Sequence, residues 1–345
     1  MFQFLQLKNS SPVSFLFCLG LVFSSCLASS AAKAQGTSLT EKKTEFKLAK
    51  RHWIELSRSD TRVIIVDNAA VDVPQLPKHR AGYSGVACLT HKQQDRNIFV
   101  PGIAGLNFEH IHDGSTRRLV EKFEPRKFPM ELRVINDYTV ELYQPPTKNW
   151  KLESCGRYEL LEDGTIEYTF ECIPRGANFR DKFIGLFWAS YIHQPEDKAI
   201  FFKARPVGSR QPPGWIKAVT PKHGVESTHR PVGVRGLPKI DVDFPLTLVN
   251  HPSGYEHCES WYYGVCRKMA LVQMFRPQDR VWMAQSPSGG GQGNPAWDFQ
   301  WFVDQPQVGQ LYRLVMRMAY FPYSGPSQVA GRVQQHLAAL GELKR

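Results

Sequence analysis

The sequence lacks several patterns that define common classes of protein. None of its seven cysteines forms a Cys-x-x-Cys pair, so neither a zinc ribbon nor a thioredoxin-type redox motif is supported. No Gly-x-Ser-x-Gly elbow of a serine hydrolase occurs. The glycine run at 289–291 is not followed by the Lys-Ser/Thr pair of a phosphate-binding loop. These absences argue against all four kinds of site.

A dense basic run is also missing, although positive charge is in excess. Lys and Arg number 43 against 32 Asp and Glu, which gives a net charge of +11. Such an excess favours anionic partners, for example acidic polysaccharides. Because the charges are scattered and no nucleic-acid module is recognisable, we expect no nucleic-acid binding.

The first 34 residues have the pattern of a secretory signal peptide. Lys8 precedes an apolar run from Val13 to Leu27, and Ala32-Lys33-Ala34 supplies a small-x-small cleavage pattern. The run is short for a membrane span, and no later stretch is apolar for long enough. We therefore expect cleavage after Ala34 and export to the periplasm or the extracellular space. Lipidation at Cys26 is the rival interpretation.

Five cysteines would remain after cleavage, which is an odd number. In an oxidising compartment the best candidate disulfides are Cys155 with Cys172 and Cys258 with Cys266, which would leave Cys88 free.

The rest of the chain predicts one large all-β domain. Residues 35–51 are polar and Lys-rich, and we expect them to form a flexible lead-in to a domain at 52–323. Within it, alternating segments are separated by turn residues, which is typical of antiparallel hairpins. The expected strands are 53–56, 63–66, 128–135, 138–143, 157–161, 165–172, 184–192, 199–204, 246–249, 264–275, 280–284, 297–303 and 311–321.

Three further segments stand out. Residues 183–191 are almost wholly apolar, which predicts a central strand covered on both faces. Residues 205–243 are rich in proline and glycine and predict a long loop, with Trp215 as a possible anchor. Apolar residues at helical spacing predict one short helix at 327–340, within a C-terminal segment 324–345.

The segment 105–118 concentrates ionisable side chains. If residues 106–113 form a strand, the period of two separates them onto two faces: Phe108, His110 and His112 on one, and Asn107, Glu109, Ile111 and Asp113 on the other. Three interpretations stay open: solvated charges on an edge strand, a histidine pair for proton transfer or sugar contact, and two metal ligands completed by His193 or His257. A cupin-type metal site is excluded, because Thr116 and Arg117 stand where its glutamate would be needed.

Two other segments are candidates for a binding site. Residues 254–263 mix His257 with aromatic rings, which suits either a sugar platform or a turn with buried rings. Trp297 and Asp298 follow the glycine run and could close over a ligand.

Together, the motif Glu109-His110-Ile111-His112-Asp113, the many antiparallel strands and the run from Ser286 to Phe299 resemble the galactose mutarotase-like (aldose 1-epimerase-like) superfamily, in a poorly characterised secreted bacterial branch. The resemblance spans residues 52–323. It implies a large antiparallel β-supersandwich whose concave sheet face binds carbohydrate. It also implies a histidine acid and a carboxylate base acting at the anomeric centre of a sugar.

The chemistry of the side chains supplies the candidates for these roles. Histidine suits an acid near neutral pH, and guanidinium matches a carboxylate or sulfate on a sugar. The candidate catalytic residues are His110, His112, His193, His257, Glu109, Asp113 and Asp298. The candidate substrate-binding residues are Arg117, Arg118, Arg133, Trp261 and Trp297.

The sequence therefore predicts an exported carbohydrate-active protein, with an aldose or acidic-sugar mutarotase as the leading hypothesis. One alternative is a non-catalytic carbohydrate-binding protein on the same fold. The other is a polysaccharide lyase or hydrolase. We expect no cofactor and no metal, and the partner would be a carbohydrate, neutral or anionic.

Overall fold

The computed structural model describes residues 36–180, 183–234, 238–244 and 251–342. The predicted signal peptide and the predicted strand 246–249 lie outside these residues and stay predictions. None of the helices in the described part of the chain is long and apolar enough to cross a membrane.

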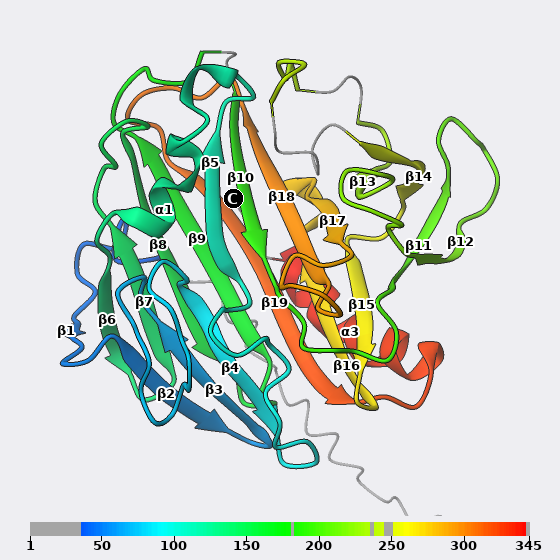
Figure 1. Cartoon of the computed structure of the whole chain (residues 1–345), viewed down its shortest axis with the longest axis horizontal. Coiled ribbons are helices and arrows are strands. Elements are labelled where there is room, and N and C mark those ends of the chain that lie inside the picture. Colours follow the sequence, from blue (N-terminus) through cyan, green and yellow to red (C-terminus); the bar gives the residue numbers. More distant parts are fainter. Residues whose placement is uncertain (1–35, 181–182, 235–237, 245–250, 343–345) are drawn as a thin grey trace, which may run out of the picture. The chain divides into compact units, whose positions relative to one another are not determined.

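Most strands form one large sheet, as Figure 1 shows. Within the described residues it has 16 strands, and all neighbours are antiparallel except β13 and β14. This confirms the predicted all-β, antiparallel architecture. In order of hydrogen-bonded neighbours the strands are β1 (Lys47–Leu48), β6 (Glu131–Asn136), β7 (Thr139–Gln144), β8 (Leu152–Leu160), β9 (Ile166–Pro174), β19 (Tyr312–Pro322), β16 (Met269–Phe275), β15 (Trp261–Cys266), β11 (Ile200–Pro206), β14 (Pro252–His257), β13 (Thr228–Pro231), β17 (Trp282–Ser286), β18 (Ala296–Asp304), β10 (Phe183–Ala189) and β5 (Asn107–His112), with β12 (Gly214–Ala218) paired to β11.

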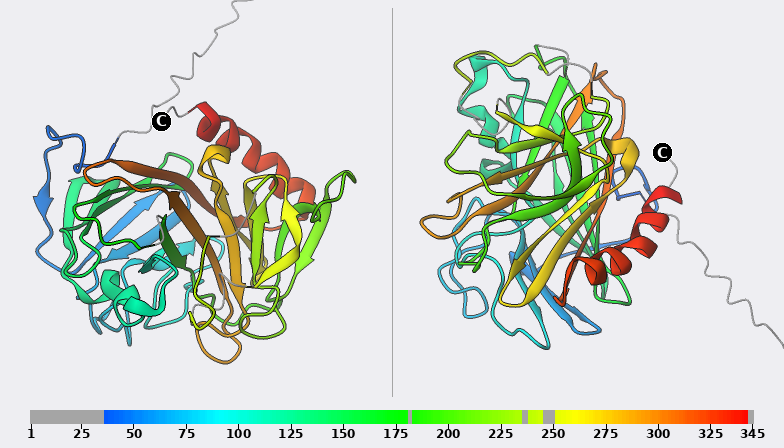
Figure 2. Two further views of the ribbon diagram at one scale, coloured as in Figure 1. Left: turned by 90° about the horizontal axis from the view of Figure 1, so that it is seen from above. Right: turned by 90° about the vertical axis from the view of Figure 1, so that its right-hand side faces the viewer.

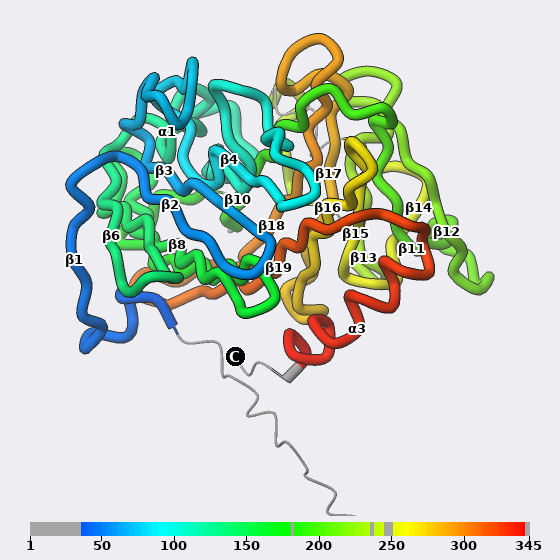
Figure 3. The backbone as a smooth tube through the Cα atoms, turned by 90° about the horizontal axis from the view of Figure 1, so that it is seen from below, coloured from blue at the N-terminus to red at the C-terminus, as the bar shows by residue number. Residues whose placement is uncertain are grey.

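A second sheet covers part of one face of the large sheet. Strands β2 (Trp53–Arg58), β3 (Thr61–Val66) and β4 (Gly85–His91) form it, and Figure 3 shows them against the larger sheet. Val63 and Val86 share one apolar core with Phe170 and Leu314 of the large sheet. Each such buried side chain contributes roughly 1.5–3 kcal/mol, so this core is the main source of stability.

The predicted C-terminal helix, α3 (Pro326–Glu342), covers the opposite face of β16 and β19 (Figure 2). Val329 and Val333 of the helix pack against Val272 and Val315, whereas the strand neighbour Leu314 faces the main core. Alternate side chains of these strands are therefore buried on opposite sides, as expected for a sheet covered on both faces.

Short elements complete the fold. The connection from β5 to β6 holds two single turns of 3-10 helix and one turn of α-helix, and a further 3-10 turn follows β16. They are η1 (Thr116–Arg118), η2 (Glu121–Phe123), α1 (Glu124–Lys127) and η3 (Pro277–Asp279).

Some expected elements differ from the structure. Strand β10 is buried throughout, as predicted, but it lies next to the edge strand β5 and not at the centre of the sheet. The predicted loop 205–243 contains β12 and β13. Trp215 on β12 packs edge-on against Trp261, with a distance of 5.6 Å between the ring centroids. The predicted strand 264–275 is part of a hairpin that turns at Arg267 and Lys268, both with positive φ.

The prediction of a flexible lead-in is wrong for residues 36–48. Thr37 and Leu39 are buried, and the Thr37 hydroxyl donates a hydrogen bond of 2.7 Å to the Glu171 carboxylate. Leu39 packs against Ile173, and β1 pairs with β6. The polar, Lys-rich composition concealed this single apolar anchor.

The predicted disulfides are also wrong, because the five cysteines of the described chain are free thiols. Cys155 lies opposite Glu171 in the β8–β9 register, and Cys172 lies opposite Ser154. The two thiols therefore point to opposite faces of the sheet. Cys258 precedes the six-residue strand β15 and Cys266 ends it, and a rise of about 3.3 Å per residue separates them beyond the reach of a disulfide.

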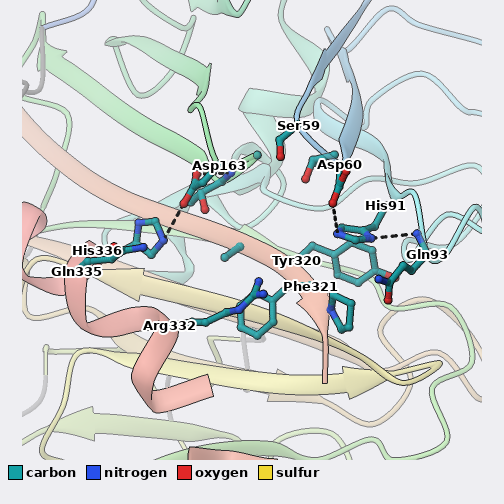
Figure 4. Close-up of a pocket in the computed structure, with 15 residues that line it drawn as sticks. Ser59, Asp60, His91, Gln93, Asp163, Tyr320, Phe321, Arg332, Gln335 and His336 are labelled. Atoms are coloured by element: carbon teal, nitrogen blue, oxygen red, sulfur yellow. Dashed lines mark hydrogen bonds and ion pairs between the residues drawn. The ribbon is translucent and has the colours of Figure 1, made fainter. Parts of the chain in front are cut away.

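A contact between Asp163 and His336 fastens α3 to the β8–β9 hairpin. Figure 4 shows the two side chains facing each other beside a cavity, with His336 Nε2 3.2 Å from Asp163 Oδ2. Burial opposes ionisation of Asp163, but hydrogen bonds from His336 and from the Thr165 backbone outweigh it and hold the pKa at about 2. Because the folded-state pKa lies below the unfolded value, the stabilisation is present above about pH 4 and is lost as the pH falls toward 2.

We expect Asp163→Asn to lower the melting temperature by about 1–3 °C at neutral pH, since the carboxylate is half-exposed and its contact is screened. The difference from the wild type should shrink between about pH 4 and pH 2 in thermal melts. Asp95→Asn, at an exposed position, is the control. A difference that stays constant down to pH 2 would contradict this role.

Candidate functional site

The pairing of β5 with β10 is irregular at Glu109. His110 lies opposite Phe187, but Trp188 lies opposite Phe108, so Glu109 is an extra residue with no partner. Such a bulge interrupts the alternation of a strand and redirects its side chains. Glu109 Oε1 consequently lies 3.6 Å from His110 Nε2.

Because of the bulge, the predicted assignment of side chains to the two faces of this strand is wrong. Phe108 and Ile111 both face the main core, although regular alternation would separate them. His110 and His112 point to the other face, and Glu109 joins them. The strand therefore presents a carboxyl group and two imidazoles together on the face away from the main core.

Glu109 is buried and held by three donors. Arg126 Nη1 donates to Oε1 at 3.2 Å, the Tyr191 hydroxyl donates to Oε2, and Asn107 Nδ2 donates to Oε2 at 3.3 Å. Burial raises the pKa of the Glu109 carboxyl, although these donors and the positive charge of Arg126 oppose the shift.

Asp298 on β18 is a second buried carboxyl group close to this cluster. Its Oδ1 accepts a hydrogen bond of 2.9 Å from the Ser190 backbone. Burial raises the pKa of Asp298 well above its ordinary value, and the charge of Glu109 adds to the shift. Burial and the charges of both carboxylates raise the pKa of Tyr191 in turn. Burial thus favours the protonated form of Glu109, Asp298 and Tyr191.

His110 lies among aromatic rings and has no hydrogen-bond partner within the described chain. Its ring centroid is 4.6 Å from that of Phe123 and 5.1 Å from that of Phe187. Neither ring nitrogen is bonded or exposed. Burial lowers the pKa of His110 well below 6.5, and His112, Lys122 and Arg126 add to the shift. The imidazole is therefore uncharged at neutral pH.

His112 has a similar environment one position further along the face. Phe244 lies over it at a centroid distance of 5.1 Å, and both nitrogens again lack a partner among the described residues. Burial lowers the pKa of His112 to about 3, with Asp113 opposing the shift and Lys122 supporting it.

Other polar side chains of the same face are buried without partners in the described structure. Gln300 lies opposite Phe187 and Trp282 in the sheet, and neither atom of its amide is bonded. The hydroxyls of Thr228 and Ser286 are in the same situation. Each such group costs about 1–3 kcal/mol if it stays unsatisfied, so this face offers several hydrogen-bonding groups to a ligand.

Residues 116–127, which we name the strap, cover the Glu109–His110 pair. Phe123 packs on His110 and Arg126 binds Glu109. The strap is anchored by Glu124, whose carboxylate accepts hydrogen bonds from the backbone of Asn149 and Trp150 at 2.9 and 3.1 Å.

Two of the predicted site residues hold the turn that follows β5. The Asp113 carboxylate accepts hydrogen bonds from the Ser115 hydroxyl at 2.6 Å and the Arg180 backbone at 2.7 Å. Arg117 donates to Asp113 and to the Asn178 carbonyl. Their contacts are those of a structured turn beside the histidines.

The other predicted arginines lie elsewhere. Arg118 donates to the Asn149 carbonyl at 2.9 Å beside Trp150. Arg133 lies on β6, where it binds Glu131 and packs on the Tyr143 ring. Neither reaches the Glu109–His110 pair.

The remaining predicted residues are also separate from the pair. The His193 carbonyl accepts a hydrogen bond from Arg267, beyond the end of β10. The ring nitrogens of His257 face the backbone carbonyls of Glu259 and Val281, and burial lowers its pKa to about 4. Trp261 packs in the cluster beneath α3, and Trp297 packs in the main core.

The structure adds residues that the sequence reasoning missed. Tyr191 and Arg126 bind Glu109, and Gln300 lies on the same sheet face. Tyr191 follows an apolar strand and Gln300 interrupts one, which are weak signals of a polar site. Among the described residues, no group of three His, Cys, Asp or Glu is arranged to hold a metal ion.

Comparisons with known proteins give distant structural likenesses. No family model and no curated protein matches the chain. An Escherichia coli protein described as a "putative aldose 1-epimerase" has 9% identity and a TM-score of 0.45, over 79% of this chain and 99% of its own. The Slr1438 protein from Synechocystis has 11% identity and a TM-score of 0.42, over 81% of this chain and 99% of its own.

Heparan sulfate lyase HepC from Pedobacter heparinus has 9% identity and a TM-score of 0.38, and 81% of this chain matches 37% of the lyase. At TM-scores below 0.5, none of the three assigns an activity to this chain.

Gly185 on β10 leaves room for the His112 ring. A Cβ atom at this position would come within 2.3 Å of the ring. We expect Gly185→Ala to lower the free energy of unfolding by about 1–3 kcal/mol in urea titrations, because the ring must move within a packed layer. Gly254→Ala is the matched control, since a Cβ there meets no atom of the described residues within 4 Å. Equal losses in both variants would contradict the packing argument.

We expect the His112 ring to stay neutral from pH 8 to about pH 4, because its pKa is lowered from 6.5 to about 3. The unfolded chain takes up this proton at higher pH than the folded chain, so stability is lost as the pH falls from about 6.5 to about 3. Ring-proton NMR titration checks this, with the His112→Gln spectrum as the assignment control. A midpoint near pH 6.5 for His112 would contradict the buried, unpaired environment.

Proposed function

We propose that this protein acts on a carbohydrate and interconverts the anomers of an aldose or acidic sugar. The observation that carries the proposal is the Glu109–His110 pair, whose side-chain atoms approach to 3.6 Å on one sheet face. Around it lie aromatic rings and hydrogen-bonding groups without partners within the described chain. Rings suit the apolar faces of a sugar, and free polar groups suit its hydroxyls.

The reaction requires one proton acceptor and one proton donor. A base removes the proton from the anomeric hydroxyl O1 while an acid protonates the ring oxygen O5; the C1–O5 bond breaks and a free aldehyde forms. The aldehyde rotates, and the reverse steps close the ring as the other anomer. Protons and electrons balance without a further reactant, because both groups return to their starting states.

The environments of the two side chains favour particular roles. His110 is neutral because burial lowers its pKa, so it suits the base of the ring-opening step. Glu109, whose pKa is raised by burial, suits the acid. This is the reverse of the roles implied by the sequence resemblance. In ring closure the two groups exchange roles, so either anomer can enter the reaction.

Access to the pair depends on the strap. Phe123 covers the imidazole of His110 and Arg126 covers the carboxyl group of Glu109. A substrate reaches both groups when these side chains move aside, and closure of the strap afterwards excludes water. Loop movements of this kind are ordinary in enzymes on the microsecond-to-millisecond timescale.

Proton NMR of freshly dissolved α-glucose, α-galactose and glucuronic acid tests the activity directly. We expect the protein to accelerate anomeric equilibration over buffer, and we expect His110→Ala or Glu109→Gln to lower the rate by about 10²–10⁴-fold. His193→Ala is the matched control, because this histidine lies beyond the end of β10, and its rate should equal that of the wild type.

Two outcomes would overturn the proposal. Equilibration no faster than in buffer, with saturation-transfer signals from a sugar, would make the protein a carbohydrate-binding protein without turnover. Acceleration that survives both Glu109→Gln and His110→Ala would remove the pair from the mechanism. Export to the periplasm or the extracellular space remains a prediction from the sequence.

A further inference from the structure

A hollow of about 780 Å³ lies on the outer side of the strap. It is bounded by the strap and by the ends of the small sheet. Its lining includes His52, Asn68, Phe123, Arg126, Lys127 and Met130. The other lining residues are apolar or glycine, so its ionisable groups are all basic.

The hollow and the Glu109–His110 pair share two side chains. Phe123 and Arg126 line the hollow, and the same residues contact His110 and Glu109. A single layer of side chains therefore separates the hollow from the proposed acid–base pair. A molecule bound in the hollow would lie next to the reacting groups.

The basic groups differ in how far they are already paired. His52 is held by Asp67 at 2.9 Å. Arg126 uses Nη1 for Glu109 and Nε for the Gly82 carbonyl at 2.8 Å, and its guanidinium lies over the Tyr83 ring. Lys127 is exposed, and no carboxylate within the described chain forms an ion pair with it. Lys127 thus supplies a positive charge that no acidic neighbour neutralises.

We infer that this hollow binds an anionic sugar, a hexose that carries a carboxylate or a sulfate group. The anionic group would bind Lys127 and the outer side of the Arg126 guanidinium, which suits oxyanions. The apolar face of the sugar ring would pack on Phe123 and Met130. The inference rests on the proposed function, because it places the sugar one layer of side chains away from Glu109 and His110.

An anion bound to Arg126 would also affect Glu109, because the two share this guanidinium. The guanidinium neutralises part of the charge on Glu109 and opposes the rise in the pKa of that carboxyl. An anion bound to the same guanidinium would compete with Glu109 for its hydrogen bonds. The charged end of the substrate would thereby loosen the contact that covers the acid–base pair.

Isothermal titration calorimetry with three sugars tests the inference. At about 20 mM NaCl, where charges are weakly screened, we expect D-glucuronate and glucose 6-sulfate to bind roughly tenfold or more tightly than glucose. We expect Lys127→Ala to weaken binding of the anionic sugars about fivefold and Lys127→Glu to weaken it further. Lys43→Ala, an exposed lysine on the lead-in segment, should leave all three affinities unchanged, and circular dichroism melts establish that each variant is folded.

Several results separate this inference from the proposed function. Equal affinity for glucose and both anions, or no effect of Lys127→Ala and Lys127→Glu, would overturn the anionic site even if anomers are interconverted. Tight binding of glucuronate without faster anomerisation would retain the site and overturn the mutarotase activity. Preference for one anionic sugar over the other identifies carboxylate or sulfate as the group that Lys127 recognises.

Discussion

Dehydration of both faces of the large sheet is the constraint on which the site depends. The second sheet and α3 cover opposite faces of its middle strands, and the strap covers β5. A polar side chain on such a strand loses its water and must find a partner or change its ionisation. This explains why Glu109 and Asp298 have raised pKa values while His110 and His112 have lowered ones. Burial thus favours the uncharged form of each of these four side chains.

A single extra residue in β5 determines which side chains share that environment. In a regular strand Glu109 and His110 would point to opposite faces. A shift of one residue in the register moves every later side chain of the strand to the other face. The bulge at Glu109 keeps Ile111 in the main core while Glu109 joins the two histidines outside it. The irregularity disrupts the pairing of β5 with β10 locally. In return it brings two ionisable groups into contact on neighbouring positions of one strand.

The hairpins and α3 could be predicted because alternation and helical spacing are local patterns. The bulge could not, since a template of period two assumes that each residue has a partner. Arg126 and Tyr191 contact Glu109 from positions 17 and 82 residues away along the chain, and no spacing rule reaches that far. The ring chemistry of Trp261 and Trp297 predicts sugar contacts. Strand alternation instead places both rings in apolar clusters. The packing of Leu39 could not be predicted, because a single apolar residue in a charged segment forms no periodic pattern.

The order of strands in the sheet differs from their order of synthesis. Strand β19, at residues 312–322, lies between β9 and β16 and joins the first meander to the strands that follow it. Until the ribosome has released this segment, β9 and β16 each present an unpaired edge, and open strand edges invite association with other chains. The large sheet is therefore completed only after residues 312–322 have been made. Its assembly depends on contacts between distant parts of the sequence.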